Sequence, residues 1–253
     1  MGKKRAPAER KVTEKKTSRW GNGRLWVVLL VAAGVASVSA TVAYLRFYPR
    51  YTMPSGSMIP TIDVGQRFVV RSLDAPPARG DVIVFRFPEH PDTEFAKRVI
   101  AVGGDTLSVK AGHPTINGWE VPNCKVGAYE YLDADEPGSG MRHKGDLYVE
   151  FLGASAYLTF YQEDGVLADA QGPYRAKGNE YWVMGDNRHN SHDSRMWYGG
   201  AGGGVPLELV RGGVPQPSVP LLPSGAAALQ PALDACMRSR PPLDRTTPPS
   251  SAR

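Results

Sequence analysis

The stretch Met53-Pro54-Ser55-Gly56-Ser57-Met58-Ile59-Pro60-Thr61 places two serines around a glycine and between two prolines. Proline fixes its own φ and disfavours helix in the residue before it, so a rigid, extended turn is predicted here. Gly56 has no Cβ, which lets another chain approach Ser57 closely. Clusters of Pro, Ser and Gly are usually plain turns. The surrounding sequence must therefore decide whether Ser57 has a chemical role.

An uncharged run, residues 25–45, precedes this turn. Its length suffices for a helix to cross a hydrocarbon core of about 30 Å. Aromatic residues flank it on both sides, as in the aromatic belts of membrane proteins: Trp20, Trp26, Tyr44, Phe47, Tyr48 and Tyr51. The sequence predicts a retained transmembrane anchor. The alternatives are a buried soluble helix and a cleaved secretory signal, but the apolar run continues past the small residues at 37–40.

The positive charge of the chain is concentrated before this run. Residues 1–19 hold eight lysines and arginines against two glutamates, so they carry more positive charge than the net +5 of the whole chain. Because the rest is close to neutral, the basicity does not indicate a nucleic-acid partner. Basic residues before a span place the N-terminus in the cytoplasm, so the chain after the anchor is expected on the other side of the membrane.

The sequence after the anchor has the features of a mainly β protein. Short β-branched and aromatic runs are bounded by Pro and Gly, and Asn117-Gly118 between apolar residues predicts a hairpin. A long loop is expected over residues 123–145. The predicted strands cover residues 67–70, 82–87, 97–102, 106–109, 115–121, 146–151, 157–161, 180–184 and 206–210.

The last part of the chain is predicted to be disordered. Residues 214–253 are rich in Pro, Ser and Ala, which bury too little apolar area to offset the entropy of ordering. A short helix over residues 231–238, with Pro at its first position, is the one exception considered. Cys124 and Cys236 are the only cysteines, so no disulfide framework is expected, and the sequence leaves their pairing open.

A serine hydroxyl is a poor nucleophile until a base removes its proton. Of the five histidines, His189 and His192 could pair with Asp193, while the other three lie in loop-like contexts. The other candidate is Lys97, at the start of a predicted buried strand. A lysine there usually extends to solvent or pairs with a carboxylate, but burial can lower its pKa enough to make it a base.

Residues 185–195 form the polar segment, Gly-Asp-Asn-Arg-His-Asn-Ser-His-Asp-Ser-Arg, directly after a predicted strand. Either a buried hydrogen-bonded network or a solvated loop would fit this composition. The carboxylates do not have the spacing of an EF-hand calcium loop, and no Cys/His cluster has zinc-like spacing. No metal site is expected.

Four segments in this order resemble bacterial type I signal peptidase, a membrane-anchored protease family with a Ser-Lys dyad. They are residues 54–61, 79–85, 97–105 and 185–195, and the resemblance extends over about residues 20–213. It implies a signal-peptidase-like all-β catalytic domain behind one N-terminal transmembrane helix. The expected division is a basic cytoplasmic tail (1–24), an anchor (25–45), a β-rich Ser-Lys peptidase domain (46–213) and a Pro-rich disordered tail (214–253).

The resemblance also implies roles for individual residues. Ser57 would be the nucleophile and Lys97 its general base. The Ser55 hydroxyl and the Ser57 backbone N–H would form the oxyanion hole, and Ser191 would orient the lysine. A structural ion pair is implied for Asp193 and Arg195, and shallow apolar substrate pockets for Met53, Met58, Val84 and Ala96. No metal or organic cofactor is implied.

The implied activity is removal of N-terminal signal peptides from exported preproteins at Ala-x-Ala-like sites. Partners would be preproteins and membrane lipid, at the extracytoplasmic face of the inner (cytoplasmic) membrane. The sequence departs from the family pattern at His189, usually Asp, and in the glycine run 199–204. A specialised peptidase for a few substrates, such as a conjugative pilin, and an anchored β-domain without activity remain alternatives. A LexA-type repressor is excluded because an apolar span stands where its DNA-binding domain would be.

Overall fold

The computed structural model describes residues 20–47, 50–133, 140–165 and 170–249. The chain divides into two compact units, residues 1–46 and 47–253. In the first unit, α1 (Trp20–Phe47) is one continuous helix. Its segment Gly23–Tyr44 has a mean hydropathy of 2.2 and is long and apolar enough to cross a membrane. The helix agrees with the predicted anchor, whereas most of the expected basic tail lies outside the described residues.

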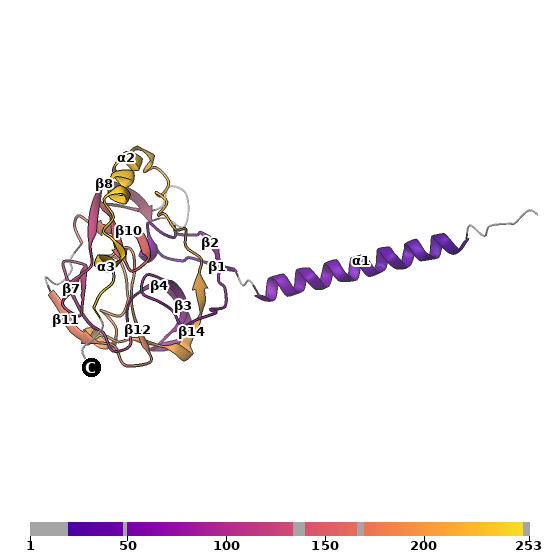
Figure 1. The fold of residues 1–253 in the computed structure, drawn as a ribbon, viewed down its shortest axis with the longest axis horizontal. Helices are drawn as coiled ribbons and strands as arrows, with labels where there is room; N and C mark the ends of the chain where they lie inside the picture. The colour runs from indigo at the N-terminus through magenta and orange to yellow at the C-terminus, as the bar shows by residue number, and fades with distance from the viewer. Residues whose placement is uncertain (1–19, 48–49, 134–139, 166–169, 250–253) are drawn as a thin grey trace, which may run out of the picture. The chain divides into compact units, whose positions relative to one another are not determined.

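The second unit is a β-domain in which neighbouring strands of the described residues pair antiparallel (Figure 1). This confirms the expectation of a mainly β protein. The strands are β1 (Arg50–Thr52), β2 (Arg67–Val69), β3 (Val82–Phe87), β4 (His90–Val102), β5 (Thr106–Lys110), β6 (His113–Ile116), β7 (Trp119–Glu120), β8 (Asn123–Asp133), β9 (Met141–Leu152), β10 (Ser155–Gln162), β11 (Ala170–Arg175), β12 (Glu180–Met184), β13 (Val205–Pro206) and β14 (Val210–Val214).

The described residues of this domain form four sheets. The largest has the order β13-β12-β4-β3-β14, and β10-β9-β8 and β11-β5-β6-β7 form two others, beside the small β1-β2 ribbon. The buried half of β4 and nearly all of β3 and β12 lie inside the domain, which explains their near-continuous apolar sequence. This five-stranded sheet, called the central sheet below, therefore offers a buried position for a residue such as Lys97 in β4.

Several predicted elements are confirmed and others are wrong. Asn117 and Gly118 both have positive φ and join β6 to β7, as the hairpin signal predicted. The prediction of a long loop over residues 123–145 is wrong. Most of these residues belong to β8 and to the start of β9, which pair with each other antiparallel. Every second or third residue of β8 faces solvent. Many of its side chains are therefore polar, and the composition of the strand resembles that of a loop. The strand expected at 206–210 is a 3₁₀ turn, Leu207–Leu209, between β13 and β14.

The prediction that the C-terminal tail is disordered is also wrong. Residues 214–249 belong to the second unit and contain α2 (Gln230–Arg238), the short helix expected at 231–238, and α3 (Leu243–Thr246). Figure 1 shows α2 beside β8, and a disulfide joins Cys236 of α2 to Cys124 of β8. Average composition failed here because a few apolar residues, placed on one buried face, suffice to pack the tail.

The tail completes a group of buried side chains, the β8 core cluster. Leu233 and Cys236 of α2 pack with Tyr131 of β8, Phe160 of β10 and Ile59, which follows the Ser57 turn. Farther along, Gly153 N donates to Thr246 O at 2.6 Å, and Asn117 Nδ2 donates to Pro249 O at 2.7 Å. The full set is Ile59, Val126, Tyr131, Leu147, Val149, Phe151, Ala156, Leu158, Phe160, Ala226, Leu233 and Cys236.

Candidate active site

Residues 55–58 are called the nucleophile turn, after the role expected of Ser57. They contain one 3₁₀ turn, Gly56–Met58, which follows an extended Ser55. Ile59 N donates to Gly56 O at 3.2 Å, and Thr61 N donates to Met58 O at 2.8 Å. The turn is therefore closed by its own backbone. A turn is confirmed here, but residues 56–58 are helical and not extended as predicted. Ser57 is buried, with 7% of its surface exposed.

Lys97 reaches Ser57 from β4. Its Nζ donates to Ser57 Oγ at 2.7 Å and to Ala96 O at 3.2 Å. Register places Lys97 opposite Ile83 of β3, inside the central sheet, and only 4% of the lysine is exposed. The structure thus brings together the serine and the lysine, which lie 40 residues apart in sequence.

Burial determines the protonation of Lys97. Loss of hydration lowers its pKa to about 8, because an ammonium is disfavoured inside the protein. The carboxylates of Asp193 and Asp186 act in the opposite direction, and the charge of Arg195 again lowers the pKa. A lysine with this pKa is partly neutral near physiological pH and can accept a proton from the serine hydroxyl.

Two further serines lie close to the dyad. Ser55 Oγ donates to Ser57 Oγ at 3.2 Å from an exposed position. The hydroxyl of Ser191 is buried and makes no hydrogen bond of ordinary geometry in the described parts of the chain, although it lies near enough to Asp193 to help lower the pKa of that carboxyl. The hydrogen bond expected from Ser191 to Lys97 is therefore not observed. A Cβ on Gly185 would lie 2.3 Å from Ser191 Oγ and 2.4 Å from Ser57 O, so only glycine fits there.

Asp193 and Arg195 form a buried ion pair, with Arg195 Nη2 2.8 Å from Asp193 Oδ2. Burial alone would raise the pKa of Asp193, but the charge and hydrogen bonds of Arg195 outweigh it, so the pKa is lowered. Gly185 N also donates to Asp193 Oδ2 at 2.9 Å. This bond connects the ion pair to the glycine below the nucleophile turn.

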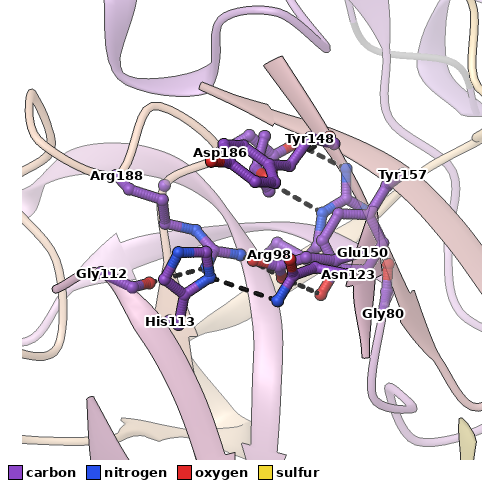
Figure 2. A network of polar contacts seen from close by, with 12 residues as sticks. Gly80, Arg98, Gly112, His113, Asn123, Tyr148, Glu150, Tyr157, Asp186 and Arg188 are labelled. Atoms are coloured by element: carbon purple, nitrogen blue, oxygen red, sulfur yellow. Dashed lines mark hydrogen bonds and ion pairs between the residues drawn. The ribbon is translucent and has the colours of Figure 1, made fainter. Parts of the chain in front are cut away.

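A second buried ion pair lies behind the site. Arg98 donates to both carboxylate oxygens of Asp186, at 2.7 and 2.6 Å, and to Gly80 O at 2.7 Å (Figure 2). Thr61, which ends the stretch around Ser57, donates to the same carboxylate. Because one arginine satisfies two carboxylate oxygens and a carbonyl, the start of the polar segment is fixed against β4.

Glu150 and Arg188 form a third buried ion pair, also drawn in Figure 2, at 2.5 Å between Arg188 Nη2 and Glu150 Oε2. Tyr157 and Tyr161 each donate to Glu150, at 3.0 and 2.9 Å. Burial, and then the charge of Glu150, raise the pKa of both phenols well above the usual value. The Tyr157 ring also covers the Arg98 guanidinium at 3.9 Å, so it contacts both ion pairs.

These contacts show that both ends of the polar segment belong to a buried hydrogen-bonded network, while residues 189–192 between them are half-buried or exposed. Asp186, Asn187, Arg188, Asp193 and Arg195 are all at most 1% exposed. Sequence reasoning missed the roles of Arg98, Glu150, Asp186, Asn187 and Arg188. The available signal was the charged run directly after a buried strand, but its partners in β4 and β9 are distant in sequence.

The four residues expected to line substrate pockets lie together. Met53, Met58, Val84 and Ala96 belong to one apolar cluster that adjoins Ser57 and Lys97 along the chain, and each is at most 6% exposed. The rest of the cluster is Ile62, Val70, Val82 and Val214, with Tyr51 and Phe68 partly buried against it. A cavity of about 680 Å³ borders the same cluster at Ile62, Val82 and Val214, but neither Ser57 nor Lys97 lines it.

The alternative histidine base gains no support from the geometry. Asp193 already binds Arg195 and Gly185, and the His192 ring packs edge-on against Phe87 at 5.6 Å. His189 packs against Tyr161, and burial, followed by the charge of Arg195, lowers its pKa. Within the described ranges, no group of three His, Cys, Asp or Glu side chains could hold a metal ion.

The known proteins to which this chain is similar are signal peptidases. A family model described as "Signal peptidase, peptidase S26" matches residues 24–218. Signal peptidase I of Aquifex aeolicus (strain VF5) is 34% identical over 206 residues, which cover 68% of this chain and 76% of that protein. Signal peptidase I of Pseudomonas fluorescens is 33% identical over 163 residues, 58% of this chain and 54% of that protein. A crystal structure of a signal peptidase I from Enterococcus faecalis V583 covers 56% of this chain and 98% of its own, at 20% identity and a TM-score of 0.30.

The family match spans well over half of the chain, which places the protein in the class of peptidases, among the hydrolases. More particularly, the chain belongs to the signal peptidase family, peptidase S26. The matched region spans only about half the length of the Pseudomonas relative. The family match ends at residue 218, before the part of the tail that carries α2 and α3.

Proposed function

We propose that this protein is a membrane-anchored serine endopeptidase that removes signal peptides from exported preproteins through a Ser57–Lys97 dyad. The observation that carries the proposal is the 2.7 Å hydrogen bond between Lys97 Nζ and Ser57 Oγ at a buried position. Membership in the signal peptidase family supports the same reaction. A lysine that served only as a surface charge would extend to solvent, whereas Lys97 is buried against the Ser57 hydroxyl.

In the first step, neutral Lys97 takes the proton of Ser57 as its Oγ attacks the carbonyl carbon of the scissile peptide bond. The carbonyl oxygen becomes an oxyanion, and the Ser57 N–H and the Ser55 hydroxyl are its proposed donors. The Lys97 ammonium then gives its proton to the departing amine, which leaves an acyl-enzyme and a neutral lysine. Lys97 next activates a water that hydrolyses the ester, and it returns the proton to Ser57.

The substrate specificity is proposed to come from Met53, Met58, Val84 and Ala96. As members of one buried apolar cluster, they would form shallow apolar pockets that suit the small residues of Ala-x-Ala-like cleavage sites. One excess methylene in such a pocket is commonly worth about 1–3 kcal/mol of discrimination. Met58 follows Ser57 and Ala96 precedes Lys97, so the residues that would select the substrate are held by the same turn and strand as the dyad.

The location is proposed from the apolar helix and the basic residues before it. α1 would span the inner membrane once, with the N-terminus in the cytoplasm and the β-domain on the extracytoplasmic side. The chain between the end of the span and Ser57 is short, which would keep the active site near the membrane surface where signal peptides lie. Membrane lipid and preproteins would then be the partners, and nucleic acid would not be one.

The decisive experiment is cleavage of a purified preprotein by the full chain in detergent micelles. Wild type is expected to cut after an Ala-x-Ala site, and Ser57→Ala and Lys97→Ala are each expected to abolish cleavage. Matched controls are Ser224→Ala and Lys177→Ala, both at exposed positions, which should leave the rate unchanged. An active Lys97→Ala variant would show that the base lies elsewhere. Failure of wild type on general preproteins, with activity on a pilin precursor, would favour the specialised peptidase instead.

A further inference from the structure

Asn187 holds the backbone on both sides of Ser57. Its side-chain Nδ2 donates to Gly56 O at 3.0 Å, and its backbone N–H donates to Ser57 O at 3.2 Å. The Gly56 carbonyl and the Ser57 N–H belong to one planar trans peptide unit, in which the two groups point in opposite directions. A hydrogen bond that fixes Gly56 O therefore also fixes the direction of the Ser57 N–H, the proposed oxyanion donor.

The side-chain amide of Asn187 is itself oriented by Tyr131. Asn187 Nδ2 has two hydrogens, and the one not used by Gly56 is donated to Tyr131 Oη at 2.8 Å. Asn190 Nδ2 donates to the same phenol at 3.4 Å. The buried Oδ1 of Asn187 has no partner within the described ranges, so the hydrogen bonds that set this amide come from its nitrogen. Tyr131 is thus the acceptor that directs the amide toward the nucleophile turn.

Tyr131 is well placed for this role because its own ring is fixed. It lies in β8, is 7% exposed, stacks on His143 at 4.8 Å and contacts Phe160 edge-on at 5.4 Å. Its hydroxyl would be 3.2 Å from a Cβ placed on Gly56, which shows how closely the phenol approaches the turn. A side chain held by its sheet in this way can transmit a precise position to a neighbouring loop.

We propose that Tyr131 is a positioning residue for the reaction, which directs the Ser57 N–H toward the oxyanion through the amide of Asn187. The inference rests on the proposed function. Removing the Tyr131 hydroxyl leaves a buried N–H of Asn187 without an acceptor, and the amide is then free to turn away from Gly56. The peptide unit before Ser57 loses its anchor, although substrate contacts elsewhere remain.

The test is Tyr131→Phe in the full chain, which keeps the ring and its packing and removes only the hydroxyl. Outright loss of an oxyanion donor costs about 10²–10³ in kcat, so misdirecting one is expected to lower kcat about tenfold with KM unchanged. A peptide boronate ending in Ala-x-Ala, which forms a tetrahedral adduct on Ser57, should bind weaker by the same factor. The matched control is Tyr129→Phe, on the same strand, whose hydroxyl contacts only Ser224 O at 3.5 Å among the described hydrogen bonds.

A second variant separates positioning from general destabilisation. Asn187→Ala should lower kcat at least as much as Tyr131→Phe, and the double variant should be no worse than Asn187→Ala, because the phenol acts through the amide. Additive losses, an equal effect of Tyr129→Phe, or a rise in KM that matches the loss of boronate affinity would each overturn the proposal.

Hydrogen exchange distinguishes failure of this inference from failure of the proposed function. Backbone amides in residues 53–60 should exchange faster in Tyr131→Phe than in wild type, whether or not the protein cleaves preproteins. Faster exchange with a wild type that is inactive on every substrate would show that Tyr131 anchors the peptide unit before Ser57, and would refute the proposed reaction. Unchanged exchange in that segment, with normal cleavage by wild type, would refute the role of Tyr131 alone.

Discussion

The protonation of Lys97 is expected to control the pH dependence of cleavage. The perturbation is a change of pH across the range in which a buried lysine titrates. Only the neutral amine can accept the Ser57 proton, so the rate should follow the neutral fraction. Lys97 has a pKa of about 8, chiefly because burial disfavours its ammonium.

The size of the effect follows from this value. At pH 7 about one molecule in ten has a neutral Lys97, compared with about one in three thousand for a lysine at the ordinary value of 10.5. Burial therefore raises the reactive population about 300-fold. It also destabilises the fold by about 3 kcal/mol below pH 8, because the unfolded chain binds the proton more tightly. The free energy of unfolding should accordingly rise with pH between about 8 and 10.5 through this residue.

The assay is kcat/KM for an internally quenched peptide with an Ala-x-Ala site, measured from about pH 6 to pH 10. The value should rise tenfold per pH unit and level off above a midpoint of about 8. A midpoint below 6.5 would refute the reasoning and point to His189, whose pKa is lowered by burial. Any residual rate in Lys97→Ala should lack this rise, and a rise that persists there would also contradict the assignment.

Three further variants test other parts of the site and the fold. Ser55→Ala should lower kcat by about 10²–10³ with KM unchanged, because an oxyanion donor is lost; single-turnover cleavage measures this. Gly185→Ala should abolish cleavage while the protein still folds, because the added Cβ would lie 2.4 Å from Ser57 O and displace the nucleophile turn. The double variant Cys124→Ala/Cys236→Ala should lower the free energy of unfolding by about 2–5 kcal/mol, because the bond closes a long loop; urea titration of the protein in micelles measures this.

Each of these variants has a matched control. Ser55→Thr keeps a hydroxyl and should retain most of the rate. Gly178→Ala adds the same methyl group where nothing lies within 4 Å, so normal activity is expected. Reduced wild type should unfold like the cysteine variant. Equal rates for Ser55→Ala and wild type, or an unchanged urea midpoint after loss of the cysteines, would contradict the corresponding argument.

The chemistry of the site could be predicted from sequence where it depends on local signals. The two prolines around Ser57 predicted a rigid turn, and the apolar run of β4 predicted a buried strand that starts at Lys97, although a lysine at that position usually extends to solvent or pairs with a carboxylate. The Ser-Lys contact itself came from the family resemblance, since spacing cannot show that residues 40 apart in sequence lie 2.7 Å apart. The long apolar helix was the simplest prediction, because length and hydropathy alone indicate it.

The missed features all depend on contacts between distant segments. In the sequence, Glu150 is an ordinary acidic residue of a strand. Its role follows only from its contacts with Arg188 and two tyrosines in the folded protein. The tail was assigned to disorder because its average composition is poor in large apolar residues. Leu233 and Cys236 lie about one helical turn apart, on the same face of α2. Two such apolar residues are enough to pack a short helix against a sheet.

The disulfide between β8 and α2 also fixes an order of events during synthesis. Its two cysteines are 112 residues apart, so β8 is made long before its covalent partner exists. Ile59, which follows the nucleophile turn, shares the β8 core cluster with Leu233 and Cys236. Ser57 and Lys97 are therefore among the first parts of the β-domain to be made, yet their support is completed only when residue 236 arrives. The packing around the nucleophile turn thus depends on a segment that is made 112 residues after the cysteine of β8.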